Sequence, residues 1–312
     1  MRLATIATAT GLRLHVRGTT GYVDLAEATG DETLASMAGL LEAGMAQGMD
    51  AARRVQGRAG VEYDQAAFGP VLPHPNRVLC LGVNYREHAI EGGRDDAPPW
   101  PESFIRCPGT ALGPYADLVR PALSEQFDYE GELAVIIGEN ARYVPADKAS
   151  GVIAGYAVLN DASAREWQRA GSQWTAGKNF EGSMPFGPEL VTQDEADLSD
   201  AQLTTRLNGE VMQSARTSQM VTGIGQTVEF FSSFTELRPG DVIATGTPGG
   251  VGFARRPPVW LKPGDVVEVT IEGVGTIRNR VVAEEGDLTD WPWHPPPINT
   301  PRPSEPNTMF RS

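Results

Sequence analysis

Two acidic residues alternate along one short segment of the 312-residue chain. The segment FDYEGELAVIIG spans residues 127–138, and Glu130 and Glu132 lie two positions apart in it. Side chains at positions i and i+2 of a β-strand point to the same face, so the two carboxylates are expected side by side. The aliphatic residues between and after them would face the core. The acidic face must then be solvated, as on an ordinary edge strand, or compensated by a cation.

A third carboxylate closes the next apolar segment. VIAGYAVLND spans residues 152–161 and ends in Asp161. An aspartate at the end of a buried strand, near a strand with two glutamates, could complete a site for a hard cation. Mg²⁺ binds oxygen ligands at about 2.0–2.1 Å and leaves positions for water and substrate oxygens. Asp128 is a fourth candidate, which we expect in a supporting or surface position.

A histidine and a glutamate form a possible general base. His88 and Glu91 lie three residues apart in GVNYREHAIEGG, residues 82–93, so one helical turn places them on the same face. A histidine oriented by a carboxylate is suited to removing a proton from water. The alternative is an exposed pair on a surface helix. The Gly- and Pro-rich loop at 92–103 is expected to act as a lid.

Cationic and amide side chains follow Asp161 directly. Ser163 and Glu166 match the S-x-x-E capping box, which predicts that a helix begins there. Arg165 and Gln168 would share one face of that helix, near the carboxylates. Lys178 lies in a Gly-flanked loop on the same side. An ion pair with another acid is the ordinary alternative for Arg165, and simple solvation is the alternative for Lys178.

The glycine-rich segment ATGTPGGVG, residues 244–252, does not match a nucleotide-binding motif. It lacks the lysine of a P-loop and does not fit G-x-G-x-x-G. Its backbone N–H groups could still bind a carboxylate, and the Thr247 hydroxyl could add a donor.

The elements that must position these residues fall into two patterns. Residues 1–30 predict short strands, and an i, i+3, i+4 apolar pattern predicts an amphipathic helix over 32–55. The Pro-rich segment 69–76 ends this unit, so we place a small α+β domain at 1–72. Residues 73–290 predict many short strands, a hairpin at Asn208-Gly209, and helices from Ser163 and over 220–234. The Pro-rich residues 291–312 predict an extended tail.

Strands and helices do not alternate, which disfavours a doubly wound parallel sheet. The sequence therefore predicts an α+β protein with a mixed or antiparallel β-roll or sandwich as its catalytic domain. Seven strands are expected in that domain at the residue ranges 77–85, 103–106, 132–138, 152–161, 203–211, 239–247 and 263–273.

Composition excludes several classes of partner. The formal net charge of −14 argues against binding to nucleic acid or to an anionic membrane surface. Neither cysteine, Cys80 or Cys107, belongs to a zinc-type cluster, and no apolar run approaches the roughly 20 residues that span a bilayer. No cleavable signal is evident at the N-terminus. We expect a cytoplasmic protein with a small-molecule substrate.

Taken in order, these motifs resemble those of the fumarylacetoacetate hydrolase family. The resemblance covers residues 75–283 and rests on five motifs: Asn84-Tyr85-x-x-His88-Ala-x-Glu91; Glu130-x-Glu132; Asn160-Asp161 with Arg165 and Gln168; Gly177-Lys178-x-Phe180 with Phe186-Gly187-Pro188; and Pro239-Gly240-Asp241 followed by Thr245-Gly246-Thr247-Pro248-x-Gly250-Val-Gly252. Two positions depart from the family pattern, since Glu166 and Glu181 stand where many members have aspartate.

The resemblance implies a mixed β-roll catalytic domain, a smaller N-terminal domain and a homodimer. It implies Mg²⁺, or alternatively Mn²⁺ or Ca²⁺, bound by Glu130, Glu132 and Asp161. It places Lys178 beside the substrate, His88 and Glu91 as a water-activating pair on a lid, and Gln168 and Thr247 in contact with the substrate. The family's substrates are 2-oxo and 2,4-dioxo acids.

The predicted reaction is hydrolysis of a carbon–carbon bond in an acylpyruvate, which yields pyruvate and a carboxylic acid. Arg106 and Arg165 are further predicted substrate-binding residues, and the acyl specificity is expected to lie in the lid loop and near Gln168 and Trp174. Decarboxylation, isomerisation or hydration of 2-oxo diacids at the same site is the first alternative. A non-catalytic metal-binding protein is the second.

Overall fold

A large mixed sheet organises the computed structural model, which describes residues 1–286, 288 and 290–298. Its central strands run antiparallel to their neighbours, except that β15 pairs with β4 in parallel. β6 joins the sheet through a parallel pair with β12. In spatial order the sheet contains β3 (Tyr22–Asp24), β2 (Gly11–Arg17), β1 (Arg2–Thr8), β12 (Met184–Val191), β10 (Ile153–Asn160), β9 (Gly131–Ile137), β15 (Val242–Ala244), β4 (Val78–Gly82) and β5 (Glu102–Arg106), with β6 (Ala111–Leu112) beside β12.

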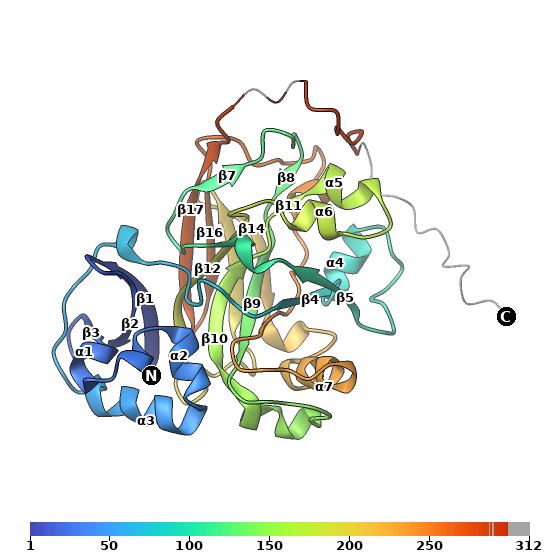
Figure 1. Ribbon diagram of the computed structural model, residues 1–312. Helices are drawn as coiled ribbons and strands as arrows, with labels where there is room; N and C mark the ends of the chain where they lie inside the picture. The colour runs from blue at the N-terminus through green and yellow to red at the C-terminus, as the bar shows by residue number, and fades with distance from the viewer. Residues whose placement is uncertain (287, 289, 299–312) are drawn as a thin grey trace.

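Two smaller sheets complete the β-structure (Figure 1). The predicted hairpin is confirmed, since Asn208 and Gly209 both have positive φ, 53° and 85°, as a tight two-residue turn requires. The five-stranded sheet has the order β14 (Glu210–Arg216), β13 (Gln202–Leu207), β16 (Val266–Ile271), β17 (Gly275–Ala283) and β7 (Leu118–Arg120), and the two-stranded sheet pairs β11 (Ser163–Ala164) with β8 (Phe127–Asp128).

Six of the seven α-helices among the described residues lie in two groups. Figure 1 shows α1, α2 and α3 around the N-terminal strands, and α4, α5 and α6 together on the other side of the large sheet. The bounds are α1 (Leu25–Thr29), α2 (Met37–Glu42), α3 (Met45–Gln56), α4 (Arg86–Glu91), α5 (Arg165–Ala170), α6 (Thr175–Lys178) and α7 (Ile224–Phe234). None of the helices in these ranges is long and apolar enough to cross a membrane.

The predicted elements differ from the structure in several details, and β7 and β17 lie outside the seven predicted strands. The single helix expected over 32–55 is a 3-10 turn followed by α2 and α3, because Ser36 caps α2 and Gly44, with φ of 90°, separates α2 from α3. β12 was not predicted, because its two prolines and its glycine are turn signals in a short segment. The predicted class, α+β with mixed sheets and no closed barrel among the described elements, is confirmed.

β9 is buried on both faces, which excludes the solvated edge strand that the sequence left open as one of two alternatives. Leu133, Val135 and Ile137 belong to one apolar cluster, whereas Ala134 and Ile136 belong to a second cluster that includes residues of α2 and α3. The large sheet is therefore covered on both sides, and the acidic residues of this strand lie in a buried environment.

The N-terminal strands continue the large sheet. β1 pairs with β12 through Arg2 opposite Val191 and Leu3 opposite Leu190. The predicted domain boundary near residue 72 stays a prediction. The segments before and after it share the large sheet and one apolar cluster. Of the predicted tail, Ile298 exchanges two hydrogen bonds with the Gln126 side chain, and residues 299–312 lie outside the described residues.

Candidate active site

Strand register brings three carboxylates together. In the antiparallel pair of β9 and β10, Leu159 lies opposite Glu132 and Asn160 opposite Gly131. The next step of this register places Asp161 beside Glu130, and the Asp161 N–H donates to the Glu130 carbonyl at 2.8 Å. One carboxylate oxygen from each of Glu130, Glu132 and Asp161 lies within 4.8 Å of the others. The pairing of β9 with β10 therefore assembles the predicted ligand set.

Cations surround this carboxylate cluster. The Lys178 ammonium donates to Glu130 Oε2 and Asp161 Oδ2, both at 2.5 Å. Arg106 is fully buried and contacts Asp161 Oδ1 through Nη1. The side chains of Lys178 and Asp161 are almost completely buried, so these ion pairs lie in a region of low effective dielectric.

The charges shift the pKa values of the carboxyls in opposite directions. Burial by itself raises the pKa of Glu130, but the positive charges of Arg165 and Lys178 outweigh it and lower that pKa overall. Burial, with the negative charges of Asp161 and Glu130, raises the pKa of Glu132 well above its usual value. Burial lowers the pKa of Lys178, but Asp161 and Glu130 reverse that effect and raise it, which keeps the ammonium charged.

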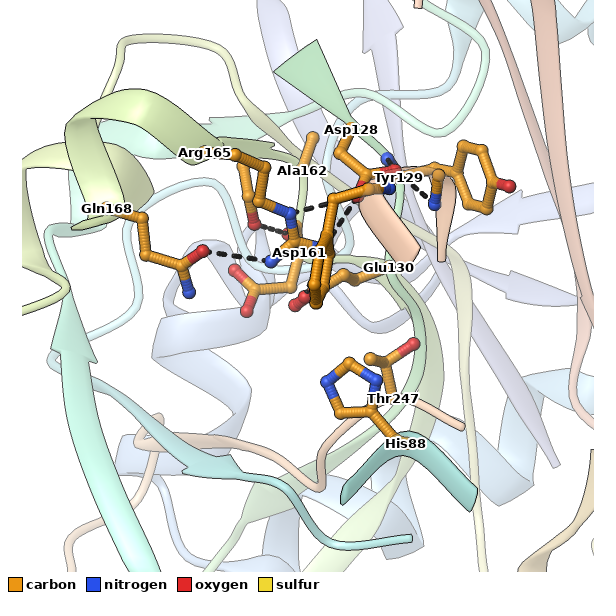
Figure 2. A network of polar contacts seen from close by, with 12 residues as sticks. His88, Asp128, Tyr129, Glu130, Asp161, Ala162, Arg165, Gln168 and Thr247 are labelled. Atoms are coloured by element: carbon orange, nitrogen blue, oxygen red, sulfur yellow. Dashed lines mark hydrogen bonds and ion pairs between the residues drawn. The ribbon is translucent and has the colours of Figure 1, made fainter. Parts of the chain in front are cut away.

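Arg165 links the cluster to a neighbouring carboxylate. Its Nη2 lies 2.7 Å from Glu130 Oε1 and 2.9 Å from Asp128 Oδ2, and its Nη1 donates to Gln168 Oε1 at 3.0 Å (Figure 2). Asp128 is completely buried and also accepts from the backbone N–H groups of Gly252 and Phe253. Asp128 thus connects the loop after β15 to the site. Of the supporting and surface positions that the sequence left open for Asp128, the structure has the supporting one.

The predicted capping box at Ser163 is absent, and that prediction was wrong. The N-cap of α5 is Ala164, and the Ser163 hydroxyl donates to the carbonyl of Asp161 instead. Glu166 turns away from the helix end and accepts from the Ser124 hydroxyl and from the N–H groups of Glu125 and Gln126. Glu166 therefore fixes the segment before β8, which explains why a glutamate can occupy this position.

His88 and Glu91 form the predicted pair on α4. Glu91 Oε1 lies 2.8 Å from His88 Nδ1, and Glu91 Oε2 accepts from the Gly250 N–H at 2.7 Å. With an ionised Glu91, Nδ1 carries the proton and Nε2 keeps its lone pair. Figure 2 shows His88 and Thr247 on one side of the site, with Arg165 and Gln168 on the other.

A cavity of about 880 Å³ joins these side chains. The lid loop borders it, and a bidentate pair between Arg94 and Glu102, at 2.7 and 2.9 Å, joins two points of that loop. Aromatic walls are supplied by Phe104, Trp174 and Phe253. Of the predicted site residues, those that line the cavity are His88, Glu130, Glu132, Arg165, Gln168, Lys178 and Thr247.

Three predicted site residues lie behind the cavity wall. Asp161 and Arg106 contact each other beneath it, and Glu91 lies behind His88. Arg106 also contacts Ser183 and the carbonyl of Ala162, so its guanidinium is engaged within the protein. This placement favours orientation of Asp161 by Arg106 over direct contact with a substrate.

Gln213 is a residue that the sequence analysis did not single out. Its Nε2 donates to Thr247 Oγ1 at 2.7 Å, and its Oε1 accepts from the Gly131 N–H at 3.0 Å. The Thr247 hydroxyl in turn donates to the Gly131 carbonyl, so its proton is already engaged and it meets a ligand chiefly as an acceptor. Gln213 lies in β14, and no motif of the sequence points to it.

The donor set fits a divalent cation. Three clustered carboxylates offer only oxygen, the ligand that Mg²⁺ and Mn²⁺ prefer. With all four carboxyls ionised, as they would be around a bound cation, these buried carboxylates exceed the three buried cations by one negative charge. A divalent ion would then leave the site with one net positive charge, suited to an anionic substrate. The carboxylates are Asp128, Glu130, Glu132 and Asp161, and the cations are Arg106, Arg165 and Lys178.

Replacing Asp128 by alanine is expected to lower the free energy of unfolding by about 3–5 kcal/mol. The change leaves the buried Arg165 short of one partner and removes the acceptor for three backbone N–H groups, those of Tyr129, Gly252 and Phe253. Urea unfolding measures the difference. Asp128→Asn keeps an acceptor oxygen and should lose less. An Asp128→Ala variant within about 0.5 kcal/mol of the wild type, the usual range for surface changes, would contradict this role.

Comparison with known proteins gives a consistent picture. The model of the family described as fumarylacetoacetate (FAA) hydrolase, C-terminal, matches residues 77–282. The chain is 43% identical over 221 residues to "Oxaloacetate tautomerase FAHD2A, mitochondrial" of Bos taurus, and this match covers 70% of each of the two chains.

Two solved structures show the same similarity over more of the chain. An HpcE protein from Mycobacterium smegmatis is 35% identical to this chain with a TM-score of 0.83. The match covers 91% of this chain and 100% of the M. smegmatis chain. The maleylpyruvate hydrolase of Sphingobium sp. SYK-6, solved with manganese(II) and pyruvate, has a TM-score of 0.71 and 28% identity with the same coverage.

Proposed function

Because the chain belongs to the fumarylacetoacetate hydrolase family, we propose that it interconverts the keto and enol forms of an oxaloacetate-like 2-oxo diacid. The observation that supports this proposal most directly is that one cavity has His88, oriented by Glu91, on one wall and the carboxylate cluster with Lys178 on another. The oxaloacetate tautomerases among the relatives support it. The alternative reaction on 2-oxo diacids thus moves ahead of the hydrolysis that the sequence favoured.

Glu130, Glu132 and Asp161 would hold the divalent cation, which supplies Lewis-acid polarisation of a 2-oxo group when bound. The Lys178 ammonium lies against two of these ligands and would stabilise negative charge on the 2-oxo oxygen as the enol forms. Arg165 orients Glu130 and, through the Gln168 carbonyl, aims the amide group of Gln168.

His88 would move the proton at carbon 3. Its Nε2 has a lone pair when Nδ1–H is held by Glu91, so it can take a proton from carbon 3 of the keto acid, which gives an enolate. The imidazolium would then give that proton to the enolate oxygen to complete the enol, and the same two transfers in reverse order would restore the keto form. Glu91 stabilises the imidazolium in between. The Gly250 N–H fixes the second oxygen of Glu91, which holds the pair in one orientation.

A second candidate is hydrolysis of an acylpyruvate. The same His88–Glu91 pair can take a proton from water instead of carbon, and the hydroxide would then attack the distal carbonyl of a 2,4-dioxo acid. The C–C bond breaks, and pyruvate leaves as its enol form. The maleylpyruvate hydrolase among the structural neighbours favours keeping this candidate.

One assay separates the two reactions. The purified protein, with Mg²⁺ or Mn²⁺ and with EDTA as the metal-free control, is given oxaloacetate, acetylpyruvate and fumarylpyruvate while the enol absorbance and free pyruvate are followed. Faster enol–keto exchange of oxaloacetate without pyruvate supports the tautomerase. Equal amounts of pyruvate and acid from an acylpyruvate support the hydrolase. No metal-dependent change on any of these acids would contradict both.

Two further expectations accompany the proposal. A homodimer and a cytoplasmic location stay predictions, and sedimentation of the purified protein and imaging of the tagged chain in its host would test them. Mn²⁺ is as suitable as Mg²⁺ for the all-oxygen donor set, so both ions belong in every assay.

A further inference from the structure

A glycine-rich loop binds carboxylates of the protein itself. This loop, residues 245–253, follows β15 directly. The Gly246 N–H donates to Glu132 Oε2 at 2.8 Å, and the Gly250 N–H donates to Glu91 Oε2 at 2.7 Å. The first acceptor belongs to the carboxylate cluster, and the second belongs to the histidine pair. The loop therefore connects the two groups that the proposed reaction needs side by side.

The glycine-rich loop lies between α4 and β14. A Cβ atom on Gly249 would lie 3.1 Å from the Cβ of Glu87 in α4, and a Cβ atom on Gly250 would lie 2.1 Å from the carbonyl oxygen of Met212 in β14. Gly250 also has a φ of 104°, a backbone conformation that favours glycine. Because glycine allows the loop to pack directly on both elements, a shift of the loop would be passed on to α4.

Gln213 of β14 fixes the centre of this loop. Its Nε2 donates to Thr247 Oγ1 at 2.7 Å and to the Pro248 carbonyl at 2.9 Å, while its Oε1 accepts from the Gly131 N–H at 3.0 Å. These backbone partners determine the orientation of the amide, because an N–H can only donate and a carbonyl can only accept. Gly131 separates the two glutamates of the cluster in the sequence, so this buried side chain joins the loop to the segment of the metal ligands.

We propose that Gln213 is a positioning residue that sets where the His88–Glu91 pair lies relative to the carboxylate cluster. This inference rests on the proposed function, in which His88 moves a proton on a substrate bound at the cluster. The pairing of β9 with β10 fixes the cluster itself, whereas Glu91 is held by the N–H of Gly250, two residues beyond Pro248. Without Gln213 the loop loses two contacts and the pair can shift, and a displacement of about 1 Å can cost about 10²-fold in rate.

Replacing Gln213 by methionine tests the proposal, since methionine has a similar length and makes none of the three hydrogen bonds. We expect kcat on oxaloacetate to fall about ten- to a hundredfold, as for a small misplacement of a catalytic group. The KM and the dissociation constant of Mn²⁺ should stay unchanged, because the cluster keeps its strand pairing. Steady-state kinetics and calorimetric titration with Mn²⁺ measure these constants.

A second measurement needs no turnover. Long-range ¹H–¹⁵N spectra of the Mg²⁺-loaded protein, at a pH where imidazoles are neutral, show which ring nitrogen of each of the four histidines carries the proton. The His88 signals are those that disappear in His88→Ala. The wild type should show the proton on Nδ1, where Glu91 accepts it, and Gln213→Met should show a mixture of both tautomers.

Gln193→Met is the matched control. The Gln193 amide donates to the carbonyls of Ser150 and Ile153, both at 2.8 Å, and Gln193 lines a different cavity. This substitution removes comparable contacts to the backbone, but it should keep both the wild-type kcat and the Nδ1 tautomer of His88. Circular dichroism and thermal melting establish that each variant is folded.

Thr247→Val is the second variant, for use if Gln213→Met does not fold. Valine keeps the shape of threonine and removes one of the two contacts between Gln213 and the loop. The His88 tautomer should shift in the same direction as in Gln213→Met, and an unchanged tautomer would contradict the proposal.

The outcomes distinguish this inference from the proposed function. If Gln213→Met keeps the wild-type kcat and the Nδ1 tautomer, the Gln213 assignment is overturned while the proposed function stands. If kcat falls together with the affinity for Mn²⁺, Gln213 acts on the cluster instead, and the assignment is again overturned. If the wild type has no metal-dependent reaction on any acid, the proposed function fails, and the tautomer of His88 alone decides whether Gln213 positions the pair.

Discussion

Replacing Glu132 by glutamine is expected to abolish metal binding and to lower metal-dependent turnover by about 10³-fold or more, because Lewis-acid polarisation contributes several kcal/mol. The same change should leave the metal-free protein at least as stable as the wild type. Glu132 is 1% exposed and lies beside Glu130 and Asp161. Glutamine is uncharged, the state that burial and the two neighbouring carboxylates favour at this position, and its oxygen can still accept from the Gly246 N–H.

The ionisation of Glu132 also makes the stability of the metal-free protein depend on pH. The folded-state pKa of Glu132 is raised, so the folded metal-free protein binds this proton more tightly than the unfolded chain does. The stability of the metal-free wild type should therefore fall as pH rises from the ordinary glutamate pKa toward the raised one, and Glu132→Gln should lack that component.

Thermal melting with and without Mn²⁺ measures both effects of this substitution. At a metal concentration of 100 times the dissociation constant, the wild type should gain about 2.7 kcal/mol, and Glu132→Gln should gain nothing. Glu125→Gln is the matched control, because the Glu125 side chain is exposed and pairs with Arg120 across the surface. A Glu132→Gln variant that is still stabilised by Mn²⁺ to the wild-type extent would rule out Glu132 as a ligand.

Replacing His88 by alanine is expected to lower kcat by about 10²–10⁴, the range of general acid–base catalysis. The dissociation constant of the metal should stay unchanged, since His88 lies outside the carboxylate cluster. Glu91→Gln should reduce kcat as well. A glutamine amide can donate to Nδ1 and so favour the tautomer with its proton on Nε2, the wrong nitrogen for a base.

Steady-state kinetics on oxaloacetate and on an acylpyruvate, together with Mn²⁺ melting curves, test this prediction. His74→Ala is the matched control, since His74 is exposed and lies outside the cavity. Full turnover by His88→Ala on every acid tested would show that another group moves the proton. A loss on the acylpyruvate alone would assign His88 to water activation and leave the tautomerase reaction to other groups.

Local spacing allowed much of the candidate site to be predicted. The period of two in a strand puts Glu130 and Glu132 on one face, and the i, i+3 spacing of a helix puts His88 beside Glu91, whichever residues surround them. The hairpin at Asn208-Gly209 is equally local, since it depends on two residues that tolerate positive φ. The roles of these residues in catalysis stay predictions until the variants are measured.

Residue spacing could not predict contacts between segments that are distant in the sequence. Arg106 contacts Asp161 across 55 positions, and Lys178 contacts Glu130 across 48. The capping box at Ser163 failed for the same reason, since Glu166 bonds to residues about 40 positions away instead of to its own helix. A local motif competes with tertiary partners that its own sequence does not contain.

Residue spacing was enough to predict that Glu130 and Glu132 share a strand face, that His88 and Glu91 share a helix face, and that the class is α+β with mixed sheets. Those properties depend on backbone periods of two and 3.6 residues, which short segments carry intrinsically. Three other features could not be predicted without the folded chain: β9 is buried on both faces, Arg106 contacts Asp161 instead of lining the cavity, and Arg165 and Arg169 lie against Phe253. Burial and ion pairing depend on which remote segments pack together, and that packing is a property of the whole fold.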